Sequence, residues 1–229
     1  MKFDIITLFP EMFSAIKDEG VISRALKNSI ISIREWQLRE FSTNKYKNVD
    51  DKLYGGGAGM VMQVKPIRDC LRKIKEQHPD TKVVYLSPQG EPLNQKLVEK
   101  LAAFESLTLL CGRYEGVDER IIENDIDYEV SIGDYVISGG ELAAMVVIDA
   151  ISRRLPGVLG NEVSLKDSFT DNVLDCPHYT RPEVIDNQAV PEVLLSGNQA
   201  KIDAWRLEQS IKKTKQKRPD LLVKLIYIL

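Results

Sequence analysis

The sequence predicts an α/β fold with a parallel sheet, followed by a small all-helical domain. From about residue 82 to residue 155, short apolar segments of strand character alternate with helical segments. This alternation requires crossover connections, which make neighbouring strands parallel. Two of the strand segments, VVYL and LTLLC, are nearly continuous apolar runs, as is typical of strands covered on both faces. A helical pattern returns from Pro191 onward and indicates the second domain.

Each element of the first domain can be placed from its local pattern. Residues 3–9 (FDIITLF) are apolar and predict the first strand. Pro10 then opens a helix to about Leu26, because proline is tolerated in a first helical turn. The remaining expected ranges are strand 30–38, a polar loop over 39–63, helix 66–77, strand 82–86 with helix 92–104, strand 107–111 with helix 117–124, and strand 128–132 with helix 141–155.

The alternation of strand and helix stops after Arg154, and this places the domain boundary. We expect one domain over residues 1–159, a linker over 160–170 and a helical domain over 171–229. Gly197 and Pro219 interrupt the C-terminal helical pattern and divide it into about three helices.

Composition and charge exclude several classes of protein. The chain has 229 residues, enough for one large domain with a small addition, and its net charge is −3. Its three cysteines are odd in number and form no CxxC, so neither a disulfide framework nor a zinc site is predicted. No apolar run reaches about 18 residues, and the N-terminus does not resemble a signal peptide. We therefore expect a cytoplasmic protein that does not enter a membrane.

Three glycine-containing loops, LSPQG, CGRYEG and SIGDYVISGGE, follow successive predicted strands. Ligands of open parallel sheets bind at the carboxyl ends of the strands, so the three loops together predict one binding pocket. Each loop alone could be an ordinary turn. The apolar, glycine-rich SIGDYVISGG is expected to lie inside the protein, where glycine permits the close approach of a ligand or another backbone segment.

The motifs of a nucleotide-binding pocket are missing from these loops. No GxGxxG follows the first strand, and GGGAGM at residues 55–60 lacks the Gly-Lys-Ser/Thr of a P-loop. The loops carry few charges, namely Arg113, Glu115 and Asp134. A neutral ligand with an aromatic ring and polar edges therefore fits better than a dinucleotide or a triphosphate.

Taken together, the motifs of this chain resemble the bacterial tRNA (guanine-N1-)-methyltransferases, which are SPOUT methyltransferases. In chain order they are YGGGAGMVM, LSPQG, CGRYEGVDER, SIGDYVISGGELAAM, LPGVLG and DSFTDNVLDCPHYTRPE. The resemblance implies a deep trefoil knot in the sheet and a bound S-adenosylmethionine, the methyl donor. The implied cofactor contacts are Tyr85, Leu86, Pro88, Gly112, Tyr114, Ile132, Gly133, Asp134, Tyr135, Val136, Ile137, Gly139 and Gly140.

The reaction that the resemblance implies is methylation of N1 of the guanine immediately 3′ of the tRNA anticodon. That nitrogen carries a proton at neutral pH, so the site needs a general base. The family's aspartate falls on Asp167, which could instead be a helix cap. The family's cation falls on Arg153, with Arg154 as the alternative. Two arginines at a helix C-terminus are also favourable with the helix dipole alone.

Further substrate contacts are implied at Glu115, Gly59 and Asp175. Glu115 could also be a solvated turn residue, and Asp175 could fix the proline turn that contains His178. We expect His178 to be structural. Some members of the family need Mg²⁺, but no cluster of carboxylates in the sequence marks a metal site.

The implied partners are tRNA and a second copy of the chain. Lys212, Lys213, Lys215, Lys217 and Arg218 form a basic stripe, which can neutralise phosphates of the anticodon branch. The target base must leave its stack to reach the cofactor. The family forms homodimers with the active site at the subunit interface.

Three alternatives stay open at this level. The nearest is another SPOUT enzyme that methylates a ribose 2′-hydroxyl or a different base. Another is an RNA-binding module without activity, which would not be stabilised by S-adenosylmethionine. The last is a nucleotide-binding α/β protein, which the missing P-loop lysine disfavours.

Overall fold

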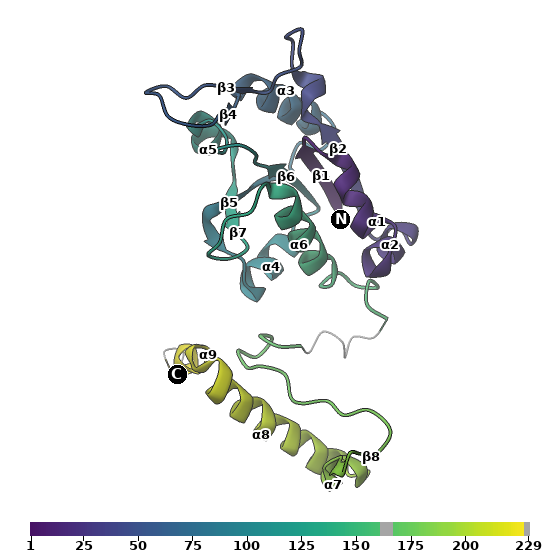
Figure 1. Cartoon of the computed structure of the whole chain (residues 1–229). Helices are drawn as coiled ribbons and strands as arrows, with labels where there is room; N and C mark the ends of the chain where they lie inside the picture. Colours follow the sequence, from purple (N-terminus) through teal and green to yellow (C-terminus); the bar gives the residue numbers. More distant parts are fainter. Residues whose placement is uncertain (161–166, 227–229) are drawn as a thin grey trace. The chain divides into compact units, whose positions relative to one another are not determined.

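A sheet of five parallel strands forms the centre of the first of two compact units, which comprise Met1–Gly160 and Asn161–Leu229. The computed structural model, drawn in Figure 1, describes residues 1–160 and 167–226. The strand order is β2-β1-β6-β5-β7, and each neighbouring pair runs parallel. The predicted α/β class is therefore confirmed, whereas the trefoil knot stays a prediction. Most of the expected linker, residues 161–166, lies outside the described residues.

The elements of the first unit follow the predicted order. The sheet strands are β1 (Lys2–Thr7), β2 (Ser32–Gln37), β5 (Lys82–Pro92), β6 (Ser106–Cys111) and β7 (Tyr128–Ser131). The helices are η1 (Pro10–Phe13), α1 (Ser14–Lys17), α2 (Gly20–Lys27), η2 (Leu38–Phe41), α3 (Val64–Lys75), α4 (Gln95–Ala102), α5 (Glu119–Asp125) and α6 (Gly140–Ser152). A short antiparallel pair, β3 (Asp50–Asp51) and β4 (Val61–Met62), lies in the predicted loop over 39–63.

The single helix expected over residues 10–26 is wrong. The chain forms a 3₁₀ turn and two short helices instead. Helix α1 ends at Lys17, Glu19 is extended, and α2 begins at Gly20, whose φ of +75° is a left-handed conformation that favours glycine.

The expected boundary of the third sheet strand is also wrong. The segment SPQGE, predicted as a loop, continues β5 as far as Pro92 after a register shift between Leu86 and Glu91. Gly90 is needed there because a Cβ atom would lie against the backbone of Glu129 and Val130 in β7. Helix α4 consequently begins later than expected, at Gln95, where the Asn94 side chain caps it.

The core lies on both faces of the sheet. One apolar cluster contains Ile5, Val84 and Leu109 with residues of α2, α4 and α6. The other contains Ile6 and Leu110 with residues of α3 and α5. Successive side chains of the same strands thus point to opposite faces of the sheet. All residues of β6 are buried. The apolar runs are therefore covered on both faces, as predicted. The three cysteines are free and buried.

The second unit is mainly helical. It contains the short strands β8 (Val184–Ile185) and β9 (Gln188–Ala189), and the helices α7 (Glu192–Leu195), α8 (Gln199–Lys217) and α9 (Pro219–Ile226). Gly197, with φ +66°, separates α7 from α8, and Pro219 opens α9, as the sequence predicted. Within the described ranges, no helix is both long enough and apolar enough to cross a membrane.

Candidate active site

A pocket of about 220 Å³ lies where β5, β6 and β7 give way to the three glycine-containing segments. Because the strands are parallel, these segments reach the same edge of the sheet. Of the residues predicted to bind the cofactor, the pocket is lined by Tyr85, Leu86, Pro88, Gly112, Tyr114, Ile132, Gly133, Tyr135, Val136, Ile137, Gly139 and Gly140. Asp134 is exposed and is not among the lining residues.

Glycines let the walls of this pocket meet. A Cβ atom on Gly140 would lie 2.8 Å from the Cα atom of Cys111, and one on Gly112 would lie 2.9 Å from the ring of Tyr85. The backbone N–H of Gly140 donates to the carbonyl of Gly112 at 2.9 Å. The third loop therefore lies directly on the second. Burial raises the pKa of the Tyr85 phenol, so that this side chain stays a neutral hydrogen-bonding group.

The expectation that SIGDYVISGG lies inside is only partly correct. Ile132 and Ile137 are half-buried and pack against the core. Tyr135 and Val136, at the tip, are 55% and 84% exposed. A burial argument from composition fails here because these apolar side chains surround the pocket mouth instead of filling the core.

The structure brings Gly59 and Glu115, two predicted substrate contacts, together beside the pocket. The N–H of Glu115 donates to the carbonyl of Met60 at 2.9 Å, and the N–H of Met62 donates to that of Gly116 at 3.0 Å. These bonds join GGGAGM to the GRYEG loop. A Cβ atom on Gly59 would lie 2.5 Å from the Cγ atom of Glu115, and Gly59 has φ +90°, so another residue here would strain the backbone and displace the Glu115 side chain.

Several lining residues were not among the predicted cofactor or substrate contacts. They are Ser87, Gln89, Arg113, Gly116, Val130, Ser131, Ser138 and Ala143. Most belong to the same three loops, so their position next to predicted residues was a usable signal. Arg113 is the most informative of them. Its guanidinium forms an ion pair with the fully buried Glu141 of α6 at 2.8 Å.

The candidate cation, Arg153, lies at the opposite end of α6 from the pocket. The pocket contains Gly140 and Ala143, whereas Arg153 caps the C-terminus of this 13-residue helix. A helix of that length spans about 20 Å. Arg154 contacts Glu99 on α4 through a 3.1 Å ion pair. Within one chain, therefore, the candidate cation and the predicted cofactor pocket lie at opposite ends of one helix.

The candidate base, Asp167, begins the described part of the second unit. Residues 168–173 form turns and not a helix, so the helix-cap interpretation of Asp167 is not supported. The segment is held in place by hydrogen bonds from Phe169 N–H to the Val173 carbonyl at 2.8 Å and from Leu174 N–H to Thr214 Oγ1 on α8 at 2.8 Å. Asp167 is thus an exposed carboxylate at the edge of a well-anchored turn.

Asp175, the remaining predicted substrate contact, belongs to a compact group with Cys176 and His178. One ligand atom from each lies within 4.8 Å of the others, so the three could hold a metal ion. The geometry also has a simpler explanation, because His178 Nε2 lies 2.7 Å from Asp175 Oδ2. Burial alone would raise the pKa of Asp175, but hydrogen bonds from His178 and from the Cys176 backbone lower it below its usual value.

We expect the substitution His178→Ala to raise the pKa of the Asp175 carboxyl. A carboxyl whose pKa is lowered on folding adds stability above its unfolded pKa, and this stability is lost as pH falls through the folded pKa. The midpoint of acid unfolding should therefore lie at a slightly higher pH in the variant than in the wild type. Because the His178 side chain is 72% exposed and the Asp175 side chain 32% exposed, solvent screens the pair, and its loss at pH 7 should amount to less than about 1 kcal/mol.

Carboxyl NMR of Asp175 across an acid titration measures this change. The exposed neighbour Thr180 gives a control, since Thr180→Ala should leave the titration unchanged. An unchanged Asp175 titration in His178→Ala would contradict a structural role for His178.

Comparisons with known proteins identify the family. A family model described as tRNA (Guanine-1)-methyltransferase TrmD matches residues 1–224. The chain is 56% identical over 224 residues to a tRNA (guanine-N(1)-)-methyltransferase of Shewanella sediminis, which covers 97% of this chain and 93% of that protein. It is also 56% identical over 226 residues to a tRNA (guanine-N(1)-)-methyltransferase of Nitrosospira multiformis. That match covers 96% of this chain and 88% of the relative. The chain therefore belongs to the tRNA (guanine-1)-methyltransferase family.

Proposed function

We propose that this protein transfers the methyl group of S-adenosylmethionine to N1 of the guanine immediately 3′ of the tRNA anticodon. The observation that carries the proposal is the single pocket built from three glycine-containing loops in a chain that matches the family along residues 1–224. Most of the pocket wall consists of loop backbone and uncharged side chains, whose N–H and C=O groups can hydrogen-bond the edge of an adenine ring, and Arg113 and Glu115 are the charged residues among those that line it. We expect the reaction to take place in the cytoplasm.

In the proposed chemistry, Asp167 removes the N1 proton of guanine. The base then carries negative charge on N1 and O6, which the Arg153 guanidinium stabilises with its fork of donors. The methyl group leaves sulfur as the nitrogen attacks, and the sulfonium becomes a neutral thioether, so no acid is needed. Holding the nitrogen in line with the methyl group supplies much of the remaining rate.

The proposed active site is completed by a second copy of the chain. Arg153 lies about 15 Å along α6 beyond Ala143, the last residue of this helix that lines the pocket, so the Arg153 that acts at a given pocket is proposed to come from the partner subunit. Leu142 and Val146 are exposed and one turn apart on α6, and Tyr135 and Val136 are exposed at the pocket mouth. A homodimer interface at this end of the pocket would cover these apolar side chains.

Glu115, Gly59 and Asp175 are the proposed contacts to the tRNA. Glu115 is exposed next to the pocket and can accept hydrogen bonds from a guanine edge. On α8, Lys212, Lys215 and Lys217 are exposed and can neutralise phosphates of the anticodon branch. Lys213 donates to the carbonyl of Asp175 at 2.9 Å, and Arg218 pairs with Asp220, so these two have structural partners.

The test uses labelled S-adenosylmethionine and two tRNA transcripts that differ only in the base 3′ of the anticodon. Methylation of the guanine transcript alone, with the product mapped to N1 by mass spectrometry, is the expected result. The same assay with Mg²⁺ or with EDTA determines whether the ion takes part. Methylation of a ribose or of another base would overturn the proposal in favour of a different SPOUT activity, and no methylation would favour a binding module.

A further inference from the structure

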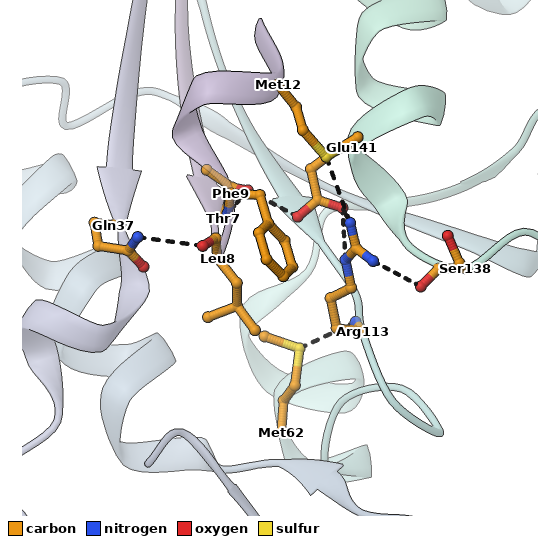
Figure 2. Close-up of polar contacts among 9 residues, drawn as sticks. All are labelled: Thr7, Leu8, Phe9, Met12, Gln37, Met62, Arg113, Ser138 and Glu141. Carbon is orange, nitrogen blue, oxygen red and sulfur yellow. Dashed lines mark hydrogen bonds and ion pairs between the residues drawn. The ribbon is translucent and has the colours of Figure 1, made fainter. Parts of the chain in front are cut away.

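A buried carboxylate at the start of α6 gathers three distant segments of the chain. Glu141 is 0% exposed, and the two oxygens of its carboxylate have different partners (Figure 2). Oε1 accepts a hydrogen bond from the Thr7 hydroxyl of β1 at 2.8 Å, and Thr7 Oγ1 itself accepts from the N–H of Phe9 at 2.9 Å. Oε2 accepts from Arg113 Nε at 2.8 Å. A buried carboxylate with this many partners is well satisfied.

Arg113 uses the rest of its guanidinium on the wall of the pocket. Its Nη1 donates to the carbonyl oxygen of Ser138 at 3.1 Å, while Nη2 pairs with Glu141 Oε2 at 2.8 Å. The side chain is only 17% exposed. One planar group therefore connects the GRYEG loop, the last turn of SIGDYVISGG and the buried start of α6. Figure 2 shows Arg113 between Glu141 and Ser138.

Aromatic and glycine neighbours fix the plane of this guanidinium. Its Cζ lies 4.4 Å from the centre of the Phe9 ring, a favourable cation–π distance. A Cβ atom on Gly139 would collide with Arg113 Nε. Gly139 thus makes room for the arginine as well as for the pocket. The φ angle of Gly139 is 174°, which any residue adopts, so the close approach is what requires glycine.

We propose that Arg113 is a positioning residue that sets the shape of the cofactor pocket by holding the Ser138–Gly140 backbone. The cofactor itself is taken from the proposed function. Ser138, Gly139 and Gly140 line the pocket, but the two glycines have no side chain and Ser138 is exposed, so no side chain of this segment anchors it in the core. Glu141 holds Arg113, and Arg113 holds the carbonyl of Ser138, so a buried charge determines where that loop backbone lies.

The geometry requires arginine and not only a positive charge. The guanidinium donates to Glu141 and to Ser138 at the same time along fixed directions. The ammonium group of lysine is a single point with no planar fork. Methionine has a similar length and an apolar stem that can still pack on Phe9, but it has no donors. These differences allow the positioning role to be separated from the role of the ion pair in stability.

The experiment compares Arg113→Met and Arg113→Lys in the full chain with the double variant Arg113→Met/Glu141→Gln. The measurements are the Kd for S-adenosylmethionine by equilibrium dialysis without tRNA, the KM for each substrate, kcat, and the thermal midpoint. We expect both single variants to weaken cofactor binding roughly tenfold or more. The KM for tRNA, and kcat at saturating cofactor, should change less than about threefold, because the hydrogen bond from Arg113 to the Ser138 carbonyl shapes the cofactor pocket and takes no part in methyl transfer.

The double variant distinguishes positioning from folding. It leaves no buried unpaired carboxylate, so its thermal midpoint should return toward that of the wild type while its cofactor Kd stays raised. Arg120→Met is the matched control, since it removes an exposed arginine–carboxylate pair with Asp118 and should leave the Kd unchanged. Recovery of both stability and cofactor affinity in the double variant would overturn the proposal, as would an unchanged Kd in Arg113→Met. A failure of the proposed function would instead appear as a wild-type protein that does not methylate guanine.

Discussion

The substitution Asp167→Asn should lower kcat for guanine methylation by about 10²- to 10⁴-fold. Asparagine keeps the size and the hydrogen-bonding ability of the side chain but cannot take up the N1 proton. Attack by the protonated nitrogen would leave a positively charged purine, which the arginine opposes. Single-turnover kinetics with saturating S-adenosylmethionine and tRNA measures this step directly. The Kd for S-adenosylmethionine should stay the same, because the proposed role of Asp167 is toward guanine alone.

Asp171 provides the matched control for this prediction. It lies in the same turn segment as Asp167 and is likewise exposed. Asp171→Asn changes the charge of the segment by the same amount, so it reproduces any general electrostatic effect on tRNA binding. Equal rates for the two variants would contradict the assignment of Asp167 as the base. A loss confined to the KM for tRNA would instead indicate a binding role.

The class of the fold was predictable because it depends on period and alternation. The runs VVYL and LTLLC lie in interior strands of the sheet and are buried on both faces, as their composition indicated. The boundaries were less predictable because they depend on contacts between distant residues. SPQGE is part of a strand because it pairs with β7. The residues of β7 are distant in the sequence, so the local pattern of SPQGE gives no sign of this pairing. The break before α2 consists of the extended Glu19 and the left-handed Gly20 inside an otherwise helical pattern.

The cofactor pocket was predictable to the level of its loops, because parallel strands bring their carboxyl ends to one edge. Arg113 was missed for a physical reason. Its partner Glu141 lies in the sequence of a helix start, where an acidic residue is ordinary, and its burial is a property of the packed structure. The exposure of Tyr135 and Val136 was also hidden, since apolar side chains at an interface and in a core look alike in sequence.

The substitution Gly90→Ala is expected to have the largest effect on stability. The added Cβ atom would lie 2.6 Å from the carbonyl oxygen of Glu129 and closer still to the neighbouring backbone carbon and nitrogen. These atoms belong to β7, which pairs with β5 on both sides of the register shift, so neither strand can move without losing sheet hydrogen bonds. Overpacking against side chains destabilises by about 1–3 kcal/mol, and a backbone obstacle should reach or exceed the upper value.

Thermal unfolding of the full chain measures the effect. A loss of about 3 kcal/mol corresponds to a Tm lower by roughly 6–12 °C for a protein of this size. Gly160→Ala is the control, because nothing lies within 4 Å of the position of its Cβ atom, and its Tm should change by no more than about 2 °C. Since Pro88 and Gln89 line the pocket beside Gly90, the variant should also bind S-adenosylmethionine more weakly. An unchanged Tm in Gly90→Ala would mean that β5 and β7 are not packed backbone to backbone at this crossing, and the pocket wall would then need a different support.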